Sequence, residues 1–530
     1  MVDPAPQRAY RAACPNCGAP VDFRSPASAF AVCSYCQSQV VRDGDTLRRI
    51  GQGAELFDDH SPLQIGASGT LAGAAFTLIG RKQFRSADGV WNEWHALFDN
   101  GRSGWLSEDN GRYVFAFDAE LATPAPPVET LRPGGRVLLM GQSWSVASVV
   151  VATLNAAQGE LPATPKTTGA IPIADLRNTL GEVGTLEYGT PDAPGWSVGR
   201  TVALADLAMR GLAEAAGKTL SGRSIQCPSC GNSVAVTLAS TKSVVCGQCH
   251  AVIDLTSAEQ GDVGGALAHY AQQGAGSEPQ IPLGTVGTLA VAGRPAAPWQ
   301  VVGYAERRDL PEDDEEESTY WREYLLYHRT EGFAFLVDAE DGWSVVVPMT
   351  GAPEVRGNVA RTGGVAYAEQ YTYRAEVTWV LGEFYWKLAR GQQAVVTDYR
   401  GSGAAQRRRL SREETQGEGT SEVTWSEGEA LDAETVRAAF RLPEAAKAAL
   451  ARDVTPVTGS KGMSWQTIAI WIAFIAIAIA VTECSDDDCD DVRNTFGAAS
   501  LEYRQCMDNR ASGSSRGGSF GGFSTGGGHK

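Results

Sequence analysis

The residues best suited to chemistry in this chain are its cysteines. Eight of the eleven cysteines fall into two quartets, each made of two CxxC pairs with fifteen residues between the pairs. The quartets are Cys14, Cys17, Cys33 and Cys36, and Cys227, Cys230, Cys246 and Cys249. Two CxxC turns at this spacing place four thiolates around one ion, as in structural Cys₄ zinc sites. Such a site has no open coordination position, so we predict two structural zinc ions and no catalytic metal.

Disulfides and a redox-active CxxC pair are the alternatives for the same residues. A redox pair belongs to a βαβ context that the sequence lacks, and disulfides are rare in a reducing compartment. Each quartet therefore predicts a zinc ribbon, at 1–45 and at 223–256. Each ribbon has too few apolar residues for a core of its own, so the metal is expected to supply the missing folding free energy. His250, which directly follows Cys249, is an alternative ligand, but a surface position is favoured.

Strand-like segments follow the ribbons, at 60–200 and 281–430. Alternating apolar residues, as in Trp91–Phe98, and turn signals such as Asp99-Asn100-Gly101 favour short antiparallel strands. Landmarks recur in register in the two segments, including Gly69-Thr70 with Gly287-Thr288, Trp91 to Trp94 with Trp321 to Tyr324, and Gly159-Glu160 with Gly382-Glu383. We therefore predict a mostly β chain with two repeats, each a zinc ribbon followed by a small antiparallel β-barrel or β-sandwich.

Helices are expected only outside the β-domains. Val202–Ala216 has the apolar spacing of an amphipathic helix, so 201–222 is predicted to be a linker helix. The segment 431–463 is predicted to begin with a helix and to end as a juxtamembrane linker. Ser464–Val481 contains no charged residue and is long enough to cross a bilayer core, which predicts one transmembrane helix at 464–482. The acidic and then Gly/Ser-rich tail at 483–530 is expected to be disordered.

Charges around the predicted span indicate its orientation. Lys447, Arg452 and Lys461 precede the span, and a run of acidic residues follows it. The positive-inside rule then places the N-terminal bulk in the cytoplasm and the tail outside. We therefore expect a single-pass membrane protein, with both quartets on the reducing side. Three further cysteines would lie outside, where a disulfide can form; they are Cys484, Cys489 and Cys506.

The composition and motifs exclude several classes of function. A net charge of −17 argues against nucleic-acid binding by the whole chain, although arginines make the first ribbon locally basic. The sequence contains no Gly-rich phosphate loop, no GxSxG elbow and no HExxH motif, so no enzyme class is indicated. The expected partners are zinc, a bilayer through 464–482, and a protein at or near the membrane.

Two glutamate positions recur in both repeats beside aromatic or apolar residues: Glu93 corresponds to Glu323, and Glu160 corresponds to Glu383. A carboxylate in such surroundings has a raised pKa and is a candidate acid or base. A solvent-facing position, or a bond to nearby backbone, is the favoured alternative. The Trp-rich strands are likewise candidates for a groove that binds a peptide or a small cation, with core packing favoured. The candidate ligand surface consists of Glu323, Tyr324, Glu383 and Trp386.

Several of these residues also resemble a bacterial domain of unknown function, family 4178. The resemblance is based on Ile79-Gly80-Arg81, Trp91-x-Glu93-Trp94, Gly382-Glu383-Phe384-Tyr385-Trp386, Asp398-Tyr399, and Leu410-Ser411-Arg412-Glu413. Copy two is the closer match. Copy one departs where Pro162-Ala163 replaces the aromatic pair, which places any function seated there in doubt. The resemblance implies no established activity, but it implies a bacterial protein, for which the predicted span would lie in the inner membrane. It also suggests a membrane-associated role in envelope stress or near polyamine metabolism.

Together these observations predict a membrane-tethered, zinc-binding scaffold that is not an enzyme. The alternative is a sensor or enzyme for a small polycation such as a polyamine, in which Glu323, Glu383 and the neighbouring aromatic residues form the site.

Overall fold

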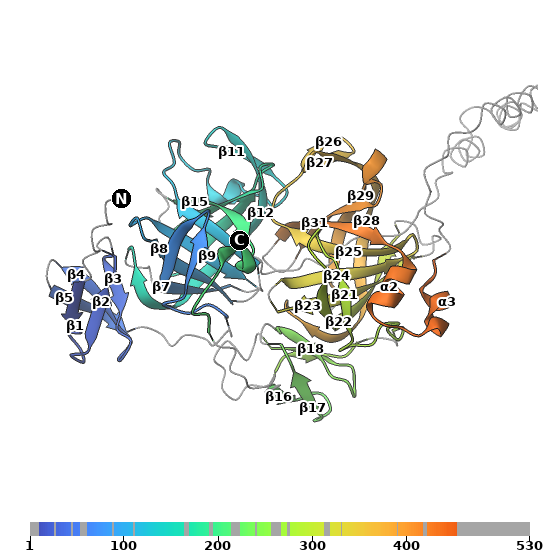
Figure 1. Ribbon diagram of the computed structural model, residues 1–530, viewed down its shortest axis with the longest axis horizontal. Coiled ribbons are helices and arrows are strands. Elements are labelled where there is room, and N and C mark those ends of the chain that lie inside the picture. The colour runs from blue at the N-terminus through green and yellow to red at the C-terminus, as the bar shows by residue number, and fades with distance from the viewer. Residues whose placement is uncertain are drawn as a thin grey trace, which may run out of the picture. The chain divides into compact units, whose positions relative to one another are not determined.

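The computed structural model describes residues 10–452, apart from 26–27, 44–45, 53–60, 87–89, 110–111, 164–168, 190–193, 214–222, 239–240, 256–266, 273–275, 312–317, 330, 389–390 and 417–420. The described chain is mostly β, as predicted (Figure 1). The proposed transmembrane segment 464–482 and the cysteines of the tail lie outside the described residues. Within the described part, no helix combines the length and the apolar character that crossing a membrane requires.

Each quartet of cysteines lies in a small ribbon of short strands. The strands of the first ribbon are β1 (Tyr10–Ala13), β2 (Pro20–Phe23), β3 (Phe30–Val32), β4 (Ser38–Asp43) and β5 (Thr46–Gln52). Those of the second are β16 (Arg223–Gln226), β17 (Ser233–Val236), β18 (Ser243–Val245), β19 (Val252–Asp254) and β20 (His269–Tyr270). In both ribbons the first two strands form a separate hairpin, β1–β2 or β16–β17.

The first β-domain is a closed barrel of eight antiparallel strands. Its order in space is β7, β8, β9, β10, β15, β14, β13 and β12, and β12 pairs back with β7. These strands are β7 (Ala74–Arg85), β8 (Val90–Phe98), β9 (Ser103–Asp109), β10 (Arg112–Asp118), β12 (Gln142–Leu161), β13 (Ile171–Arg177), β14 (Glu182–Glu187) and β15 (Gly195–Val202). The short strands β6 (Ser68–Leu71) and β11 (Arg136–Leu139) extend β7 and β12, and η1 (Val128–Thr130) follows β10.

The second β-domain closes in the same way. Its order is β22, β23, β24, β25, β31, β30, β29 and β28, and β28 pairs back with β22. These strands are β22 (Ala297–Leu310), β23 (Tyr320–His328), β24 (Gly332–Ala339), β25 (Gly342–Met349), β28 (Val365–Phe384), β29 (Gln393–Gly401), β30 (Arg408–Gln416) and β31 (Ser421–Leu431). The added elements are β21 (Val286–Leu289), β26 (Glu354–Arg356), β27 (Val359–Thr362) and η3 (Gly403–Ala405). The predicted barrel or sandwich is therefore a barrel in both repeats, which we call barrel one and barrel two.

The two barrels agree residue by residue, because their registers and bulges coincide. Gly80 pairs with Gly159 in barrel one, and Gly303 pairs with Gly382 in barrel two. Each long strand, β12 and β28, carries bulges at matching distances before these glycines. Both glycine pairs permit a close approach of strands, because a Cβ on Gly80 would lie 1.9 Å from the Glu160 carbonyl oxygen. Counting from these pairs identifies equivalent side chains in the two interiors.

Helices are short and cover the barrels. The helix α2 (Ala433–Ala439) packs Val436 against barrel two, as expected for the start of 431–463, and η4 (Glu444–Ala446) and α3 (Lys447–Leu450) follow it. The predicted helix over Val202–Ala216 is wrong in its described part. The chain there finishes strand β15 at Val202 and forms only the 3-10 turn η2 (Leu204–Leu207). The apolar spacing reflects Leu204 and Leu207, which are buried on barrel one in that single turn.

Candidate metal centres and barrel interiors

Each cysteine quartet converges on one point. In the first ribbon the Sγ atoms of Cys14 and Cys36 lie 3.7 Å apart, as do those of Cys17 and Cys33. The corresponding pairs in the second ribbon have the same separation. A disulfide would hold sulfurs about 2.05 Å apart, whereas four sulfurs at about 2.3 Å from a tetrahedral zinc ion are about 3.8 Å apart. None of the eight quartet cysteines forms a disulfide, and each quartet could hold a metal ion.

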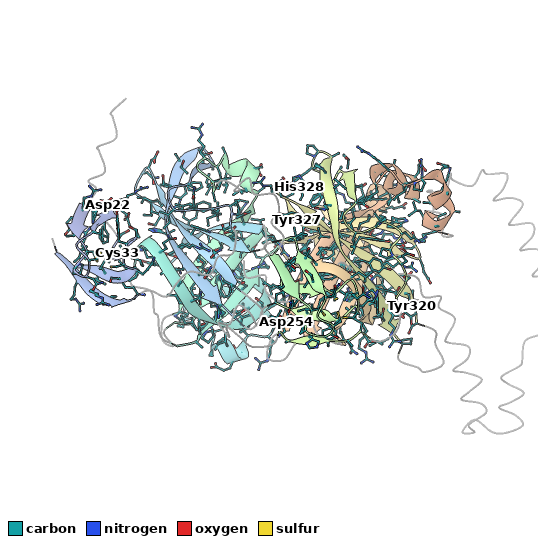
Figure 2. All side chains as sticks on the ribbon, turned by 90° about the horizontal axis from the view of Figure 1, so that it is seen from below. Asp22, Cys33, Asp254, Tyr320, Tyr327 and His328 are labelled. Atoms are coloured by element: carbon teal, nitrogen blue, oxygen red, sulfur yellow. The ribbon has the colours of Figure 1, made fainter. Side chains whose placement is uncertain are left out.

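The backbone of both ribbons is shaped to direct these thiols. In each CxxC turn an N–H group donates to the carbonyl of the first cysteine, from Gly18 to Cys14 and from Gly231 to Cys227. The second turns repeat this bond with donors Gln37 and His250, which have φ of 57°. His250 thus occupies a turn position, with its ring 5.3 Å from that of Trp379, and it is not a member of the metal cluster. Figure 2 marks one of these turns by Cys33.

One thiol in each quartet has a lowered pKa. Hydrogen bonds from Asn16 and Ser38 lower the pKa of Cys36 to about 5. The N–H of Ala251 lowers the pKa of Cys249 to about 6. Metal-bound cysteines are thiolates, so these donors favour the form that binds an ion.

The ribbons are joined to the barrels by shared strand pairing. Strand β3 pairs with the end of β12, and β18 pairs with the end of β28. At these ends lie Glu160 and Glu383, one of the two recurring glutamate pairs that the sequence presented as candidate acids or bases. Both carboxylates accept hydrogen bonds from backbone, which was the favoured alternative to an acid or base role. This backbone belongs to the ribbon and is distant from the glutamates in the sequence.

The carboxylate of Glu160 accepts bonds from the N–H groups of Arg24 and Ser25, at 2.7 and 3.0 Å. The carboxylate of Glu383 accepts bonds from the N–H groups of Thr237 and Leu238 and from the hydroxyl of Thr241. Two charge-assisted bonds to backbone fix both the position and the orientation of a docked element. We call Glu160 and Glu383 the ribbon clamps.

The proposed ligand surface of copy two does not exist as a surface. Glu323, Tyr324, Glu383 and Trp386 are 1, 0, 7 and 1 % exposed, so all four lie in the interior. Trp91, Trp94 and Trp321 are also buried, which supports core packing for these three tryptophans. The sequence pattern identified inward-facing positions, but it could not distinguish a filled interior from a lined groove.

Barrel two is filled by a buried ion cluster. Arg307 donates to both carboxylate oxygens of Glu413, at 3.1 and 3.2 Å, and to Glu323 at 3.3 Å. Its guanidinium lies 5.5 Å from the centre of the Trp321 ring. Burial alone would lower the pKa of Arg307, but Glu413 and Glu323 raise it. Burial raises the pKa of Glu323 to about 7, against the opposing influence of Arg307.

Barrel one has the same carboxylates but a different base. Glu93 and Glu187 are the equivalents of Glu323 and Glu413 by strand register. Lys82 on β7 forms the ion pair with Glu93, at 2.9 Å, and its ammonium lies 4.2 Å from the centre of the Trp105 ring. Burial would lower the pKa of Lys82, but Glu93 and Glu187 raise it, so the ammonium stays charged.

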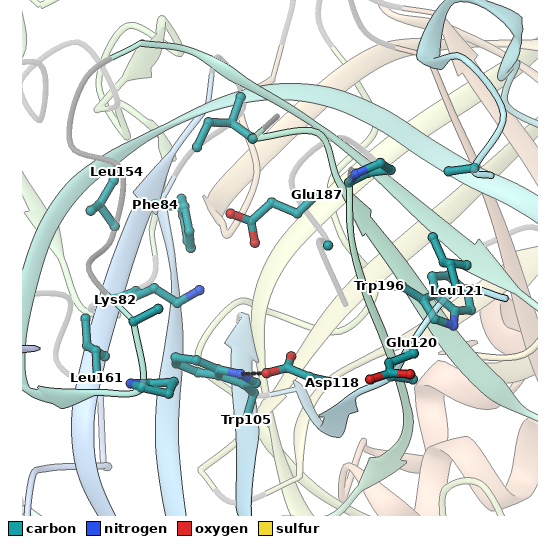
Figure 3. Close-up of a pocket in the computed structure, with 18 of the residues that line it drawn as sticks. Lys82, Phe84, Trp105, Asp118, Glu120, Leu121, Leu154, Leu161, Glu187 and Trp196 are labelled. Carbon is teal, nitrogen blue, oxygen red and sulfur yellow. Dashed lines mark hydrogen bonds between the residues drawn. The ribbon is translucent and has the colours of Figure 1, made fainter. Parts of the chain in front are cut away.

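A cavity of about 930 Å³ opens at one end of barrel one, beside this ion pair (Figure 3). Its lining includes Lys82, Phe84, Trp105, Glu187 and Trp196. His95 is near this end but is wholly buried, with its ring nitrogens 2.9 Å from the Glu160 carbonyl oxygen and 3.0 Å from the Ser103 hydroxyl. Burial lowers the pKa of His95, so it is a neutral core residue.

Comparison with family models decides the relationship of the barrels. The model described as a domain of unknown function, DUF4178, matches residues 64–204 and 294–433, which together are more than half of the chain. The chain belongs to the DUF4178 family. The matched segments contain all eight strands of barrel one and all eight of barrel two, so each DUF4178 domain here is an eight-stranded barrel. No curated protein and no solved structure matches the chain.

Sequence reasoning missed the bases of the two DUF4178 barrels. Lys82 and Arg307 occupy positions that differ by two residues in the aligned strands, so neither recurs in register. The equivalence of Glu187 and Glu413 was missed as well, because the offset between the repeats changes from 223 residues at Asp175 and Asp398 to 226 at the two glutamates. Only the strand register aligns them.

Proposed function

We propose that the two quartets bind zinc as structural ions, and that the chain is a scaffold in which zinc holds each ribbon in the form that docks on its DUF4178 barrel. The observation that carries this proposal is the convergence of four sulfurs in each ribbon, at separations that suit a tetrahedral ion. Four protein ligands leave no position for a substrate or a water molecule. The role of the ion is therefore to fold the ribbon.

The size of the ribbon cores supports this role. The core of the first ribbon consists of six buried residues, two of them cysteines of the quartet. Domains this small rarely fold without a metal or disulfides. Loss of the ion would release the segments that supply the N–H groups to the ribbon clamps.

Metal analysis of the purified full-length chain tests the proposal. Wild type is expected to contain two zinc ions per chain, and Cys33→Ser or Cys246→Ser is expected to contain one. Cys506→Ser, in the tail, is the matched control and should retain both ions. A chain without metal, or with its quartet thiols joined as disulfides, would refute the zinc assignment.

The scaffold part of the proposal concerns strand edges. Among the described strands, those of the two barrels pair on both sides, whereas β1–β2 and β16–β17 are two-stranded hairpins. Unpaired edges accept an extended segment of a partner protein. A sensor or enzyme built on Glu323 and Glu383 is not part of this proposal, because both carboxylates are buried and bonded within the chain.

The partner is proposed to act at a membrane, to which the charge-free segment 464–482 tethers the chain. Fractionation of cells should find the full chain in membranes that resist alkaline extraction, and deletion of 464–482 should release it. Light scattering of the detergent-purified chain should find a mass above that of one copy. A monomer that turns over a small molecule would refute the scaffold.

A further inference from the structure

The two DUF4178 barrels use the same interior positions in different ways. Phe84 in barrel one is the equivalent of Arg307 in barrel two, since their pairing partners Leu154 and Val377 precede the matched glycines by the same number of residues. In barrel two, therefore, the chain itself supplies a guanidinium to the carboxylate of Glu413. In barrel one the residue at this position is Phe84, whose phenyl ring cannot form an ion pair with the Glu187 carboxylate.

A second difference between the barrels creates space. Leu161, Pro162 and Ala163 line the cavity of barrel one. Counting from the matched glycines, their equivalents in barrel two are Phe384, Tyr385 and Trp386, which are all buried. Trp386 packs against Phe335, the equivalent of Trp105, with ring centres 6.2 Å apart. Smaller side chains in barrel one thus leave open the volume that aromatic rings fill in barrel two.

The charges around the cavity favour a cation. Lys82 is the single basic side chain among the described residues that line it, and it is already paired with Glu93. The lining acids are Asp118, Glu120 and Glu187. Figure 3 shows the Glu187 carboxylate directed into the same space as the Lys82 ammonium and the Trp105 indole, with Asp118 held by the Trp105 N–H at 3.4 Å.

The spacing of these acids does not suit a metal ion. Among the described residues, the only groups of three or more candidate ligands that converge on one point are the cysteine quartets. The acids of the cavity are instead distributed around walls that carry Phe84, Trp105 and Trp196. Separate carboxylates and aromatic faces suit an organic cation on an apolar stem, because ring faces attract cations and apolar walls bury the stem.

We propose that the cavity of barrel one binds a small molecule with a guanidinium group, which Glu187 holds in a bidentate pair while the stem lies against Trp105 and Trp196. A pair of the same kind exists inside barrel two. There the Glu413 carboxylate accepts two hydrogen bonds from the guanidinium of Arg307, which lies near the Trp321 ring. The site goes beyond the zinc-dependent scaffold, because neither the quartets nor the strand edges contribute to it.

Titration of the full-length chain with n-propylguanidinium, the arginine side chain without its backbone, tests the proposal. Binding is followed by tryptophan fluorescence and by ligand NMR, with n-butylammonium and neutral n-propylurea as comparison ligands. We expect saturable binding of the guanidinium, binding of the ammonium at least threefold weaker, and none of the urea. Glu187→Gln should weaken binding at least tenfold. Glu129→Gln, an exposed change outside the cavity, should leave it unchanged.

A second variant tests the comparison with the Arg307–Glu413 pair of barrel two. Phe84→Arg places a guanidinium where barrel two has Arg307, so the variant should fold, as judged by its thermal transition, and lose binding of the free ligand. If Phe84→Arg does not fold, the Glu187→Gln result decides. Absence of binding to wild type, equal binding of the urea or the ammonium, or unchanged binding by Glu187→Gln would each overturn the proposal. Metal analysis of the same samples separates this outcome from a failure of the zinc sites.

Discussion

The clamp that joins the second ribbon to its barrel allows a quantitative test. Glu383 is 7 % exposed and accepts bonds from the N–H groups of Thr237 and Leu238 and from the hydroxyl of Thr241. Glu383→Ala removes every one of these acceptors. Thr237 is exposed, so water can replace its partner, whereas Leu238 and Thr241 are buried. Each buried donor left without an acceptor costs about 1–3 kcal/mol.

We therefore expect Glu383→Ala to destabilise the docked ribbon by about 3 kcal/mol. Glu383→Gln keeps one acceptor oxygen but turns an amide NH₂ toward the remaining donors, so its effect should be smaller. Hydrogen exchange at the Leu238 and Val244 amides measures the opening free energy of this region. The control is Glu429→Gln, an exposed carboxylate 62 % accessible and 3.9 Å from Arg407, which should change stability by less than about 0.5 kcal/mol.

The reasoning fails if the alanine variant exchanges no faster than the control. It also fails if exchange rises equally in barrel two and in the ribbon, because the carboxylate would then support the barrel rather than the docking. Zinc content measured on the same sample separates undocking from loss of the ion. A docked ribbon that opens with its metal retained is the expected result.

The remaining predictions concern the interiors and the strand contacts. Gly80→Ala should destabilise the first repeat by about 3 kcal/mol in thermal unfolding, since its Cβ would lie 1.9 Å from the Glu160 carbonyl oxygen. Arg307→Met should cost about 3–5 kcal/mol in urea unfolding by leaving two carboxylates unpaired, and adding Glu413→Gln should recover part of this loss. Because burial raises the pKa of Glu323 from 4.5 to about 7, its stabilising contribution is complete below about pH 4.5 and is lost as the pH rises toward 7. Glu323→Gln should remove this component from the dependence of unfolding free energy on pH.

The sequence predicted the features that depend on short-range spacing. The two CxxC pairs of each quartet, as in Cys14, Cys17, Cys33 and Cys36, predicted a cluster that could hold a metal ion without knowledge of the rest of the chain. Landmarks such as Gly159-Glu160 and Gly382-Glu383 established the repeat, because the same strand geometry demands glycine at the same place twice. Local spacing misled the prediction at Val202–Ala216, where two leucines cover a barrel in one turn instead of lining a helix.

The interiors could not be predicted, because they depend on strands distant in the chain. Arg307 meets Glu413 across 106 residues, and Glu383 meets the ribbon across about 145. Neither partner carries a local signal for the other. The exchange of Lys82 for Arg307 adds a further difficulty. In the aligned strands β7 and β22 the two bases are two positions apart and therefore on the same face. An alignment that compares identical positions does not pair Lys82 with Arg307.

Compared with barrel two, barrel one has smaller interior side chains and therefore more open interior space. In barrel two the aromatic pair Tyr385-Trp386 and the Arg307 side chain occupy the interior. Arg307 also forms ion pairs with the buried carboxylates of Glu323 and Glu413. Barrel one lacks the bulk at Pro162-Ala163 and the guanidinium at Phe84, yet it keeps the carboxylate of Glu187. Glu187 has the nearby ammonium of Lys82 in place of a bidentate guanidinium, and beside the open cavity its carboxylate is accessible to the proposed ligand. The chain therefore combines a filled barrel with one that has an open cavity, and each barrel carries a docked ribbon whose four cysteines could hold a metal ion.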